Sequence, residues 1–383
     1  MSRYKLLTLV LVIGLFASLA VGIQAQDETL RISLVLNGVL GDKSFFDSAQ
    51  RGMDAAMDDF NIEVNSIELG IDPANWESGL DDAMSDSDSY DVLIVGTFQM
   101  MEFLAQRVHQ YPDKDFILFD TNVPYDDPDM CVDGCTNVYS VLYAQNEGSF
   151  LAGLYAAAIS MSDLDGVNES AIIGAIGGQE IPVINDFIVG YEQGACLVNP
   201  DTEVIIQYAG GWNDPARGKE IALAMFEQSA DIIFQIAGGT GVGVFEAAEE
   251  QGHYAIGVDS DQATIIADTD PDQAERILTS MLKNVDNSLY RAVELYIDGE
   301  LPLGEAETLG IAEGGVGLAQ NEFYEDATPD DVKALIAAAE EAVTAGEINI
   351  VSVFSEEPAV VGTSCADMPE TEFDVMAAME SAE

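Results

Sequence analysis

Short apolar runs rich in β-branched residues alternate with longer amphipathic runs along most of this chain. The runs typical of strands are Leu30–Asn37, Ile62–Leu69, Val92–Gly96, Phe116–Asp120, Val138–Tyr143, Ala171–Gly177, Val204–Tyr208, Ile232–Gly238 and Tyr254–Asp259. The amphipathic runs that predict helices are Ser48–Phe60, Met101–Tyr111, Glu147–Met161, Pro215–Gln228 and Val244–Gln251. Apolar strands that alternate with helices predict an α/β protein with parallel sheets built from βαβ units.

Two stretches of the chain repeat the same pattern. In each, an aspartate precedes an apolar strand, a helix follows, and a second strand ends at an aspartate: Asp91 leads to Asp120, and Asp231 leads to Asp259. Open parallel sheets bind ligands outside the carboxyl ends of their strands. We therefore expect Asp120 and Asp259 on opposite walls of one cleft, although both could instead be structural caps at strand ends.

The last third of the chain has a less regular pattern. The run Leu278–Asp286 predicts the start of a further helix, residues 304–317 are rich in glycine, and Pro329–Ala345 predicts a last amphipathic helix. Beyond about Glu356 no period is visible, which predicts a loosely held C-terminal tail over residues 357–383.

The N-terminus has the features of an export signal. Arg3 and Lys5 precede an apolar run from Leu6 to Ile23, and the small residue Ala25 precedes acidic sequence. This order predicts a signal peptide over residues 1–25 with cleavage near Ala25. The apolar run is also long enough to persist as an uncleaved membrane anchor. We thus expect an exported protein, periplasmic or on the outer face of the plasma membrane, and membrane association only through this segment or a membrane partner.

Composition and charge narrow the class of protein. A chain of 383 residues, 48% hydrophobic, is long enough for two globular domains. Its formal net charge of −56, from 13 basic and 69 acidic residues, repels nucleic acid and anionic lipid surfaces, so neither is an expected partner.

The cysteines leave their pairing open. An exported location permits disulfides among Cys131, Cys135, Cys196 and Cys365, and the first two are close enough in sequence to pair locally. The chain has 2 histidines, neither of them near a cysteine, so no zinc or other metal site is predicted.

Several blocks of sequence, in order from about residue 30 to 318, resemble the basic membrane protein family, the PnrA-like purine nucleoside-binding components of ABC transporters. The blocks are Leu36–Phe45, Glu147–Gly153, Ile176–Val183, Trp212–Lys219, Ala237–Phe245, Ile256–Gln262, Leu278–Lys283 and Glu313–Leu318. Two features depart from the family pattern. No cysteine directly follows the signal segment, since the first is Cys131, which puts lipid anchoring in doubt; and the insertion at residues 124–136 is longer than usual.

The resemblance implies a type I periplasmic-binding-protein fold, with two Rossmann-like lobes joined by a three-segment hinge. On this basis we expect lobe 1 to span residues 28–143 plus 277–303, and lobe 2 to span residues 144–276 plus 304–356. The implied function is capture of a nucleoside, with a purine as the expected base, by hinge closure, followed by delivery to the permease subunits of an ABC importer. Neither a cofactor nor an enzymatic activity is implied.

The resemblance also assigns roles to residues. Phe45 matches the family position that stacks on the base, and Trp212 is a second candidate face. Asp120 matches the position that contacts the polar edge of the base, where an ionised carboxylate would select N–H donors. Asn37 and Asp42 would add polar contacts to the ligand, or else cap the start of a helix.

The remaining candidates would bind the ribose. Asp259 can accept protons from two adjacent hydroxyls, and Asp261 is an alternative two residues further on. Lys283 matches a family lysine that would donate to the ribose or pair with a cleft aspartate. Gly239 lies in a glycine run that would let the backbone approach the ligand, because its spacing fits neither a dinucleotide fingerprint nor a phosphate loop.

Other functions stay open at this stage. The same fold could bind a flavin or a sugar, since aromatic faces favour a flat ring but do not separate a purine from a flavin. A nucleoside hydrolase is disfavoured because the aspartates lie singly at different strand ends, with no cluster that could hold a catalytic metal or position a water.

Overall fold

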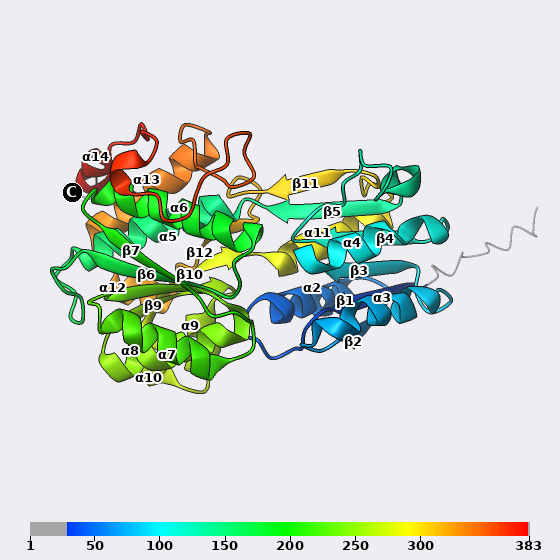
Figure 1. Ribbon diagram of the computed structural model, residues 1–383, viewed down its shortest axis with the longest axis horizontal. Coiled ribbons are helices and arrows are strands. Elements are labelled where there is room, and N and C mark those ends of the chain that lie inside the picture. Colours follow the sequence, from blue (N-terminus) through cyan, green and yellow to red (C-terminus); the bar gives the residue numbers. More distant parts are fainter. Residues whose placement is uncertain (1–28, 382–383) are drawn as a thin grey trace, which may run out of the picture.

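The computed structural model describes residues 29–381 and contains two sheets with helices on both faces (Figure 1). The first sheet has the strand order β11-β5-β4-β3-β1-β2, and the second has the order β12-β10-β9-β8-β6-β7. Neighbouring strands pair in parallel, except β10 and β12, which are antiparallel. The predicted α/β architecture with two parallel-sheet lobes is confirmed. The segment predicted as signal peptide or anchor, residues 1–25, lies outside the described residues.

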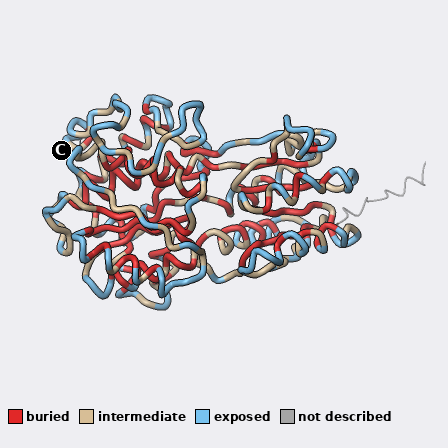
Figure 2. Tube along the Cα trace, viewed as in Figure 1, coloured by how far each residue is buried: buried red, intermediate tan, exposed pale blue. Residues whose placement is uncertain are grey.

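The nine predicted apolar runs form strands β1 to β9, whereas β10, β11 and β12 were not predicted as strands. Those of the first sheet are β1 (Leu30–Leu36), β2 (Ile62–Glu68), β3 (Val92–Gly96), β4 (Asp115–Phe119), β5 (Val138–Tyr143) and β11 (Ala306–Leu309). Those of the second sheet are β6 (Ile172–Gly177), β7 (Glu203–Tyr208), β8 (Ile232–Ile236), β9 (Tyr254–Asp259), β10 (Ile277–Lys283) and β12 (Val316–Leu318). Central strands such as β3 are apolar at every position because helices cover both faces of each sheet (Figure 2).

Lobe 1 consists of the first sheet and the helices packed on it. These are α2 (Phe45–Asp59) and α11 (Val285–Asp298) on one face, with α3 (Trp76–Ser85) and α4 (Met101–Ala105) on the other. The helix predicted over Met101–Tyr111 thus ends early, and a 3-10 turn follows at Val108–Gln110.

Lobe 2 consists of the second sheet and its helices. One face carries α5 (Gln145–Ser160), α6 (Pro182–Val198) and α13 (Asp330–Thr344), and the other carries α7 (Pro215–Phe226), α8 (Val242–Gln251), α9 (Gln262–Ala267) and α10 (Pro271–Ala274). The short helices α12 (Glu322–Ala327) and α14 (Val375–Glu380) complete the lobe. A single cluster of buried apolar residues runs through both lobes, so the lobes share a core along the hinge. No helix among the described residues is long and apolar enough to cross a membrane.

The chain crosses between the lobes three times: after β5, after β10 and between β11 and β12. The expected lobe boundaries at residues 277 and 303 need correction, because β10 pairs with β9 in lobe 2 and β11 pairs with β5 in lobe 1. The prediction of a helix from Leu278 is also wrong, because this segment forms strand β10. Its polar residues Thr279 and Ser280 are buried with satisfied hydroxyls, and they disguise an interior strand.

The C-terminal tail is attached to lobe 2, contrary to the expectation of a loose segment. Cys365 forms a disulfide with Cys196 of α6, and the backbone N–H of Gly362 donates to the carboxylate of Glu192, 3.0 Å away. A second disulfide joins Cys131 and Cys135 within the predicted insertion. Disulfides and single hydrogen bonds produce no periodic pattern in the sequence, so the attachment of the tail could not be predicted from periodicity.

Candidate ligand-binding cavity

A cavity of about 430 Å³ lies between the two lobes, at the carboxyl ends of their strands. Parallel strands direct their carboxyl ends to one edge of each sheet, and here the two edges face the same space. Of the sequence-predicted site residues, the following line this cavity: Asn37, Asp42, Phe45, Asp120, Trp212, Gly239, Asp259 and Lys283. Asp261 does not.

A buried ion pair joins the lobes inside the cavity. The ammonium of Lys283, at the end of β10, contacts the carboxylate of Asp120, which follows β4. The Lys283 side chain is only 3% exposed, and its nitrogen lies 5.8 Å from the ring centre of Phe45 and 4.8 Å from that of Phe187. Aromatic rings attract a desolvated cation. The ligand therefore meets a positive charge already held by one carboxylate and several rings.

Asp259 provides the second carboxylate, from the opposite lobe. It is 8% exposed, and burial raises its pKa to about 6 although Lys283 and the hydroxyl of Ser44 oppose the shift. Ser44, from lobe 1, donates to Oδ2 at 2.5 Å. No hydrogen bond from the described residues occupies Oδ1, so this oxygen can accept a proton from a ligand.

The two strand-end aspartates share an unusual backbone conformation. Asp120 has φ 70° and Asp259 has φ 64°, both in the left-handed region. Such a conformation costs on the order of 1 kcal/mol or more for a residue with a Cβ and occurs preferentially at functional sites. The two sequence stretches that end at Asp120 and Asp259 therefore also share their local backbone geometry. The two aspartates follow or end the third strand of their respective sheets.

Asn37 has a buried polar atom without a partner. Its amide nitrogen donates to the hydroxyl of Thr97 at 2.9 Å, whereas Oδ1 has no hydrogen bond among the described residues. A buried acceptor without a donor costs roughly 1–3 kcal/mol. Since Asn37 lines the cavity, a donor on the ligand would remove this cost.

Asp42 and Asp261 both serve as helix caps. The carboxylate of Asp42 accepts from the backbone N–H groups of Ser44, Phe46 and Asp47 at 3.0, 2.9 and 3.2 Å, at the start of α2. Asp261 accepts from the backbone N–H of Thr264 at the start of α9, and also from Asn321. Asp42 lines the cavity but has its acceptors in use, and Asp261 points elsewhere, so the choice between Asp259 and Asp261 favours Asp259.

Aromatic side chains form much of the wall. The Phe45 ring stacks on Phe119 with ring centres 5.4 Å apart, and Trp212 covers Gly178, where an added Cβ would lie 2.3 Å from the indole. Phe98, 43% exposed, and the buried Phe187 also line the cavity, and the sequence analysis missed both. Phe98 could have been found from its place just after a predicted strand; Phe187 lies within a helix and carries no such signal.

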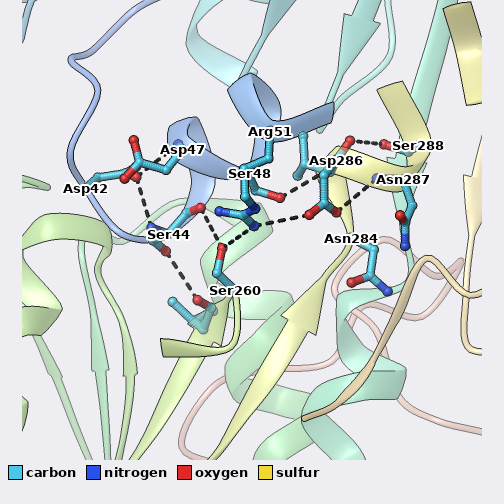
Figure 3. A network of polar contacts seen from close by, with 12 residues as sticks. Asp42, Ser44, Asp47, Ser48, Arg51, Ser260, Asn284, Asp286, Asn287 and Ser288 are labelled. Carbon is cyan, nitrogen blue, oxygen red and sulfur yellow. Dashed lines mark hydrogen bonds and ion pairs between the residues drawn. The ribbon is translucent and has the colours of Figure 1, made fainter. Parts of the chain in front are cut away.

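A polar network connects the lobes at Ser44 and Ser260 (Figure 3). The Ser260 hydroxyl in lobe 2 donates to the backbone oxygen of Ser44 at 2.9 Å. Arg51 of α2 donates both to Ser260, at 2.9 Å, and to Asp286 at the hinge, at 3.1 Å. Gly52 lets α2 approach the hinge, since an added Cβ would lie 2.4 Å from the Asp286 carbonyl oxygen. Helix α2 thus contacts the opposite lobe and the hinge together.

The described residues include no cluster of side chains typical of a metal site. Among residues 29–381, no group of three or more His, Cys, Asp or Glu side chains is arranged to hold a metal ion.

Comparison with known proteins identifies the family. The family model described as PnrA-like ABC transporter substrate-binding protein matches residues 29–348. Basic membrane protein D of Borreliella burgdorferi is 31% identical over 301 residues, covering 78% of this chain and 81% of that protein. The ABC transporter nucleoside-binding protein BmpA of Lactococcus lactis is 29% identical over 333 residues, covering 82% and 87%.

A solved structure agrees with this assignment. An ABC transporter solute-binding protein from Aeropyrum pernix K1 superposes with a TM-score of 0.75 at 27% identity, covering 86% of this chain and 95% of that one. The two-lobed arrangement is thus that of the periplasmic binding proteins. The chain belongs to the basic membrane protein family of PnrA-like ABC transporter substrate-binding proteins.

Proposed function

We propose that this protein captures a nucleoside, with a purine as its base, in the cavity between its lobes. The observation that carries the proposal is the convergence of one carboxylate from each lobe, a buried ammonium and several aromatic rings on one cavity. A nucleoside has matching chemistry, since it combines a flat apolar base with a ribose that carries adjacent hydroxyls. The printed name of the Lactococcus lactis relative, a nucleoside-binding protein, adds support.

The residues have separate roles in this proposal. Oδ1 of Asp259 and the ammonium of Lys283 bind the ribose hydroxyls, and the peptide at Gly239 passes close to the sugar. Phe45 and Trp212 stack on the base, each worth on the order of 1–3 kcal/mol. The unpaired Oδ1 of Asn37 and the carboxylate of Asp120 accept from N–H groups on the base edge.

Closure of the lobes is the second part of the proposal. A ligand that contacts both walls stabilises the closed arrangement of the lobes, and the permease subunits of an ABC importer would recognise that arrangement. Direct contacts between the lobes, such as Ser44 with Asp259 and Gln99 with Gln179, support a closed state in this structure. We place the protein outside the cytoplasmic membrane, where such importers take up their solutes.

Calorimetry with the purified protein tests the proposal. Inosine, guanosine and adenosine should bind with micromolar or tighter affinity, while ribose alone and riboflavin should bind at least 10-fold more weakly. Mass spectrometry of whatever small molecule co-purifies gives an independent readout. Absence of binding to all three nucleosides, or preferential binding of riboflavin or a sugar, would overturn it.

A further inference from the structure

The cavity has one charged end and one apolar end. Lys283, Asp120 and Asp259 lie at the ends of β10, β4 and β9, the strands nearer the hinge in each sheet. At the other end of lobe 1, the loop after β2 provides Ile71 and Pro73, and the first residue of α3 provides Trp76. Strands β4 and β2 are separated by β3 and β1, so the two ends are about 14 Å apart along the sheet edge. A purine nucleoside spans roughly two of these three strand spacings.

The apolar end contains side chains that water would not favour. Ile71 is 60% exposed and Phe98 is 43% exposed, and both line the cavity. Other large apolar side chains are exposed within residues 29–381, but Ile71 and Phe98 are the ones among them that line this cavity. No charged residue from the β2–α3 loop or the end of β3 is part of the described lining. Exposed apolar surface that gathers in a ligand cavity marks a binding area.

We propose that this apolar annex, formed by Ile71, Pro73, Trp76 and Phe98, receives an apolar substituent on the base of the bound nucleoside. The inference rests on the proposed function, because it uses the placement of the ribose at the charged end. With the sugar near Asp259 and Lys283, the base extends toward Trp212 and the outer strands. Asp120 then accepts from the part of the base edge nearer the charged end. An exocyclic nitrogen further along keeps one N–H for Asn37, which follows β1, and a substituent in place of its other hydrogen reaches the annex. A substituent on the 5′ carbon of the ribose stays at the charged end.

A homologous series of ligands tests this placement. We expect affinity to rise from adenosine through N6-methyl- and N6-propyl- to N6-pentyladenosine, because each methylene moved from water into the annex strengthens binding roughly 4-fold. Complete burial of all five carbons would strengthen binding roughly 1,000-fold. Because the annex is partly open to solvent, as the exposure of Ile71 and Phe98 shows, we expect a total gain of at least about 10-fold. A matching series of 5′-O-alkyl adenosines should show no such gain, since it extends the wrong end of the ligand.

Variants localise the effect. In the double variant Ile71→Ser/Phe98→Ser, the ratio of the adenosine dissociation constant to that of N6-pentyladenosine should fall most of the way to 1, whatever the affinity of the variant for adenosine itself. Its matched control is Ile297→Ser/Phe354→Ser, which removes side chains that are 45% and 61% exposed and lie outside the cavity; it should keep the full gain. All four positions are exposed, so folding is not at risk.

The outcomes separate the two proposals. If adenosine binds and N6-pentyladenosine binds no more tightly, or if the annex variant keeps the gain, the annex inference is wrong and the proposed function is unaffected. If no nucleoside binds, substituted or not, the proposed function fails and the annex inference fails with it.

Discussion

Replacing Asp259 with asparagine removes one negative charge from the cavity and keeps the shape of the side chain. If Asp259 holds the ribose hydroxyls, the variant exchanges charge-assisted hydrogen bonds for neutral ones, which are about half as strong. Hydrogen bonds to charged groups contribute roughly 1.5–3 kcal/mol each, so the loss of half the strength of two such bonds, one to each ribose hydroxyl, should lower affinity for ribonucleosides about 10- to 100-fold. Affinity for the free purine base should change little, since no hydroxyl is present.

The ligand-free variant should be as stable as the parent protein or more stable, although it binds ribonucleosides more weakly. Burial raises the pKa of Asp259 from 3.8 to about 6, so keeping this carboxylate ionised at pH 7.5 opposes folding by roughly 3 kcal/mol. The neutral asparagine removes that cost, and its amide oxygen can still accept from Ser44. We therefore expect a melting temperature equal to or above that of the parent protein.

Calorimetry with inosine and with hypoxanthine, together with thermal melting of both proteins, provides the assay. Asp261→Asn is the matched control: it lies two residues away, caps α9 and does not line the cavity, and asparagine is an equally good cap. A variant at Asp259 that loses stability and loses base and nucleoside binding equally would refute the ribose role and identify Asp259 as a structural residue.

Three further predictions concern pH, the disulfides and the α2–hinge contact. The pKa of Asp259 is higher in the folded than in the unfolded protein, so the contribution of this group to ligand-free stability is fully present below about pH 4 and is lost as pH rises to about 6. Nucleoside affinity should rise over the same pH range, because the ionised carboxylate binds the hydroxyls. Dissociation constants that do not differ between pH 5, 6 and 7.5 would contradict the assignment. Cys196→Ser/Cys365→Ser removes a disulfide between residues 169 apart and should lower the free energy of unfolding in urea by roughly 3–5 kcal/mol. Cys131→Ser/Cys135→Ser removes one between residues 4 apart and should lower it by about 2 kcal/mol. Equal losses would argue against an origin in the chain entropy of the unfolded state. Gly52→Ala should destabilise by about 1–3 kcal/mol because its Cβ meets the Asp286 carbonyl, while Gly317→Ala, with open space around it, should not; equal effects in thermal melts would contradict the close contact.

The fold was largely predictable because both sheets are buried on two faces. Strand β3 is apolar at every position and β8 at every position except Gln235, and this pattern can be recognised from the sequence alone. Strand β10 was missed because Thr279 and Ser280 lie in its middle, and their hydroxyls find partners that only the folded protein provides. The same error displaced the expected lobe boundary.

The candidate site was predictable where chemistry coincides with a strand end. Asp120 and Asp259 each end a predicted strand or follow it directly, so topology alone brings them together. Lys283 was assigned from the family resemblance instead, because a helix was expected where β10 lies. Phe187 was not predictable, because it lies in helix α6 and reaches the cavity only through the packing of that helix. For Asp42, the sequence correctly predicted a position beside the cavity but left open whether the side chain binds ligand or caps a helix. In the structure its carboxylate accepts hydrogen bonds from backbone N–H groups at the start of α2.

The interleaved path of the chain has a consequence for biogenesis. Helix α11 and edge strand β11 belong to lobe 1 but are synthesised after most of lobe 2, so lobe 1 remains incomplete until Leu309 has left the ribosome. Neither lobe can therefore reach its final packing early in translation. Dividing the gene anywhere between the segments that encode β1 and β11 would leave the strands of the first sheet on two separate products.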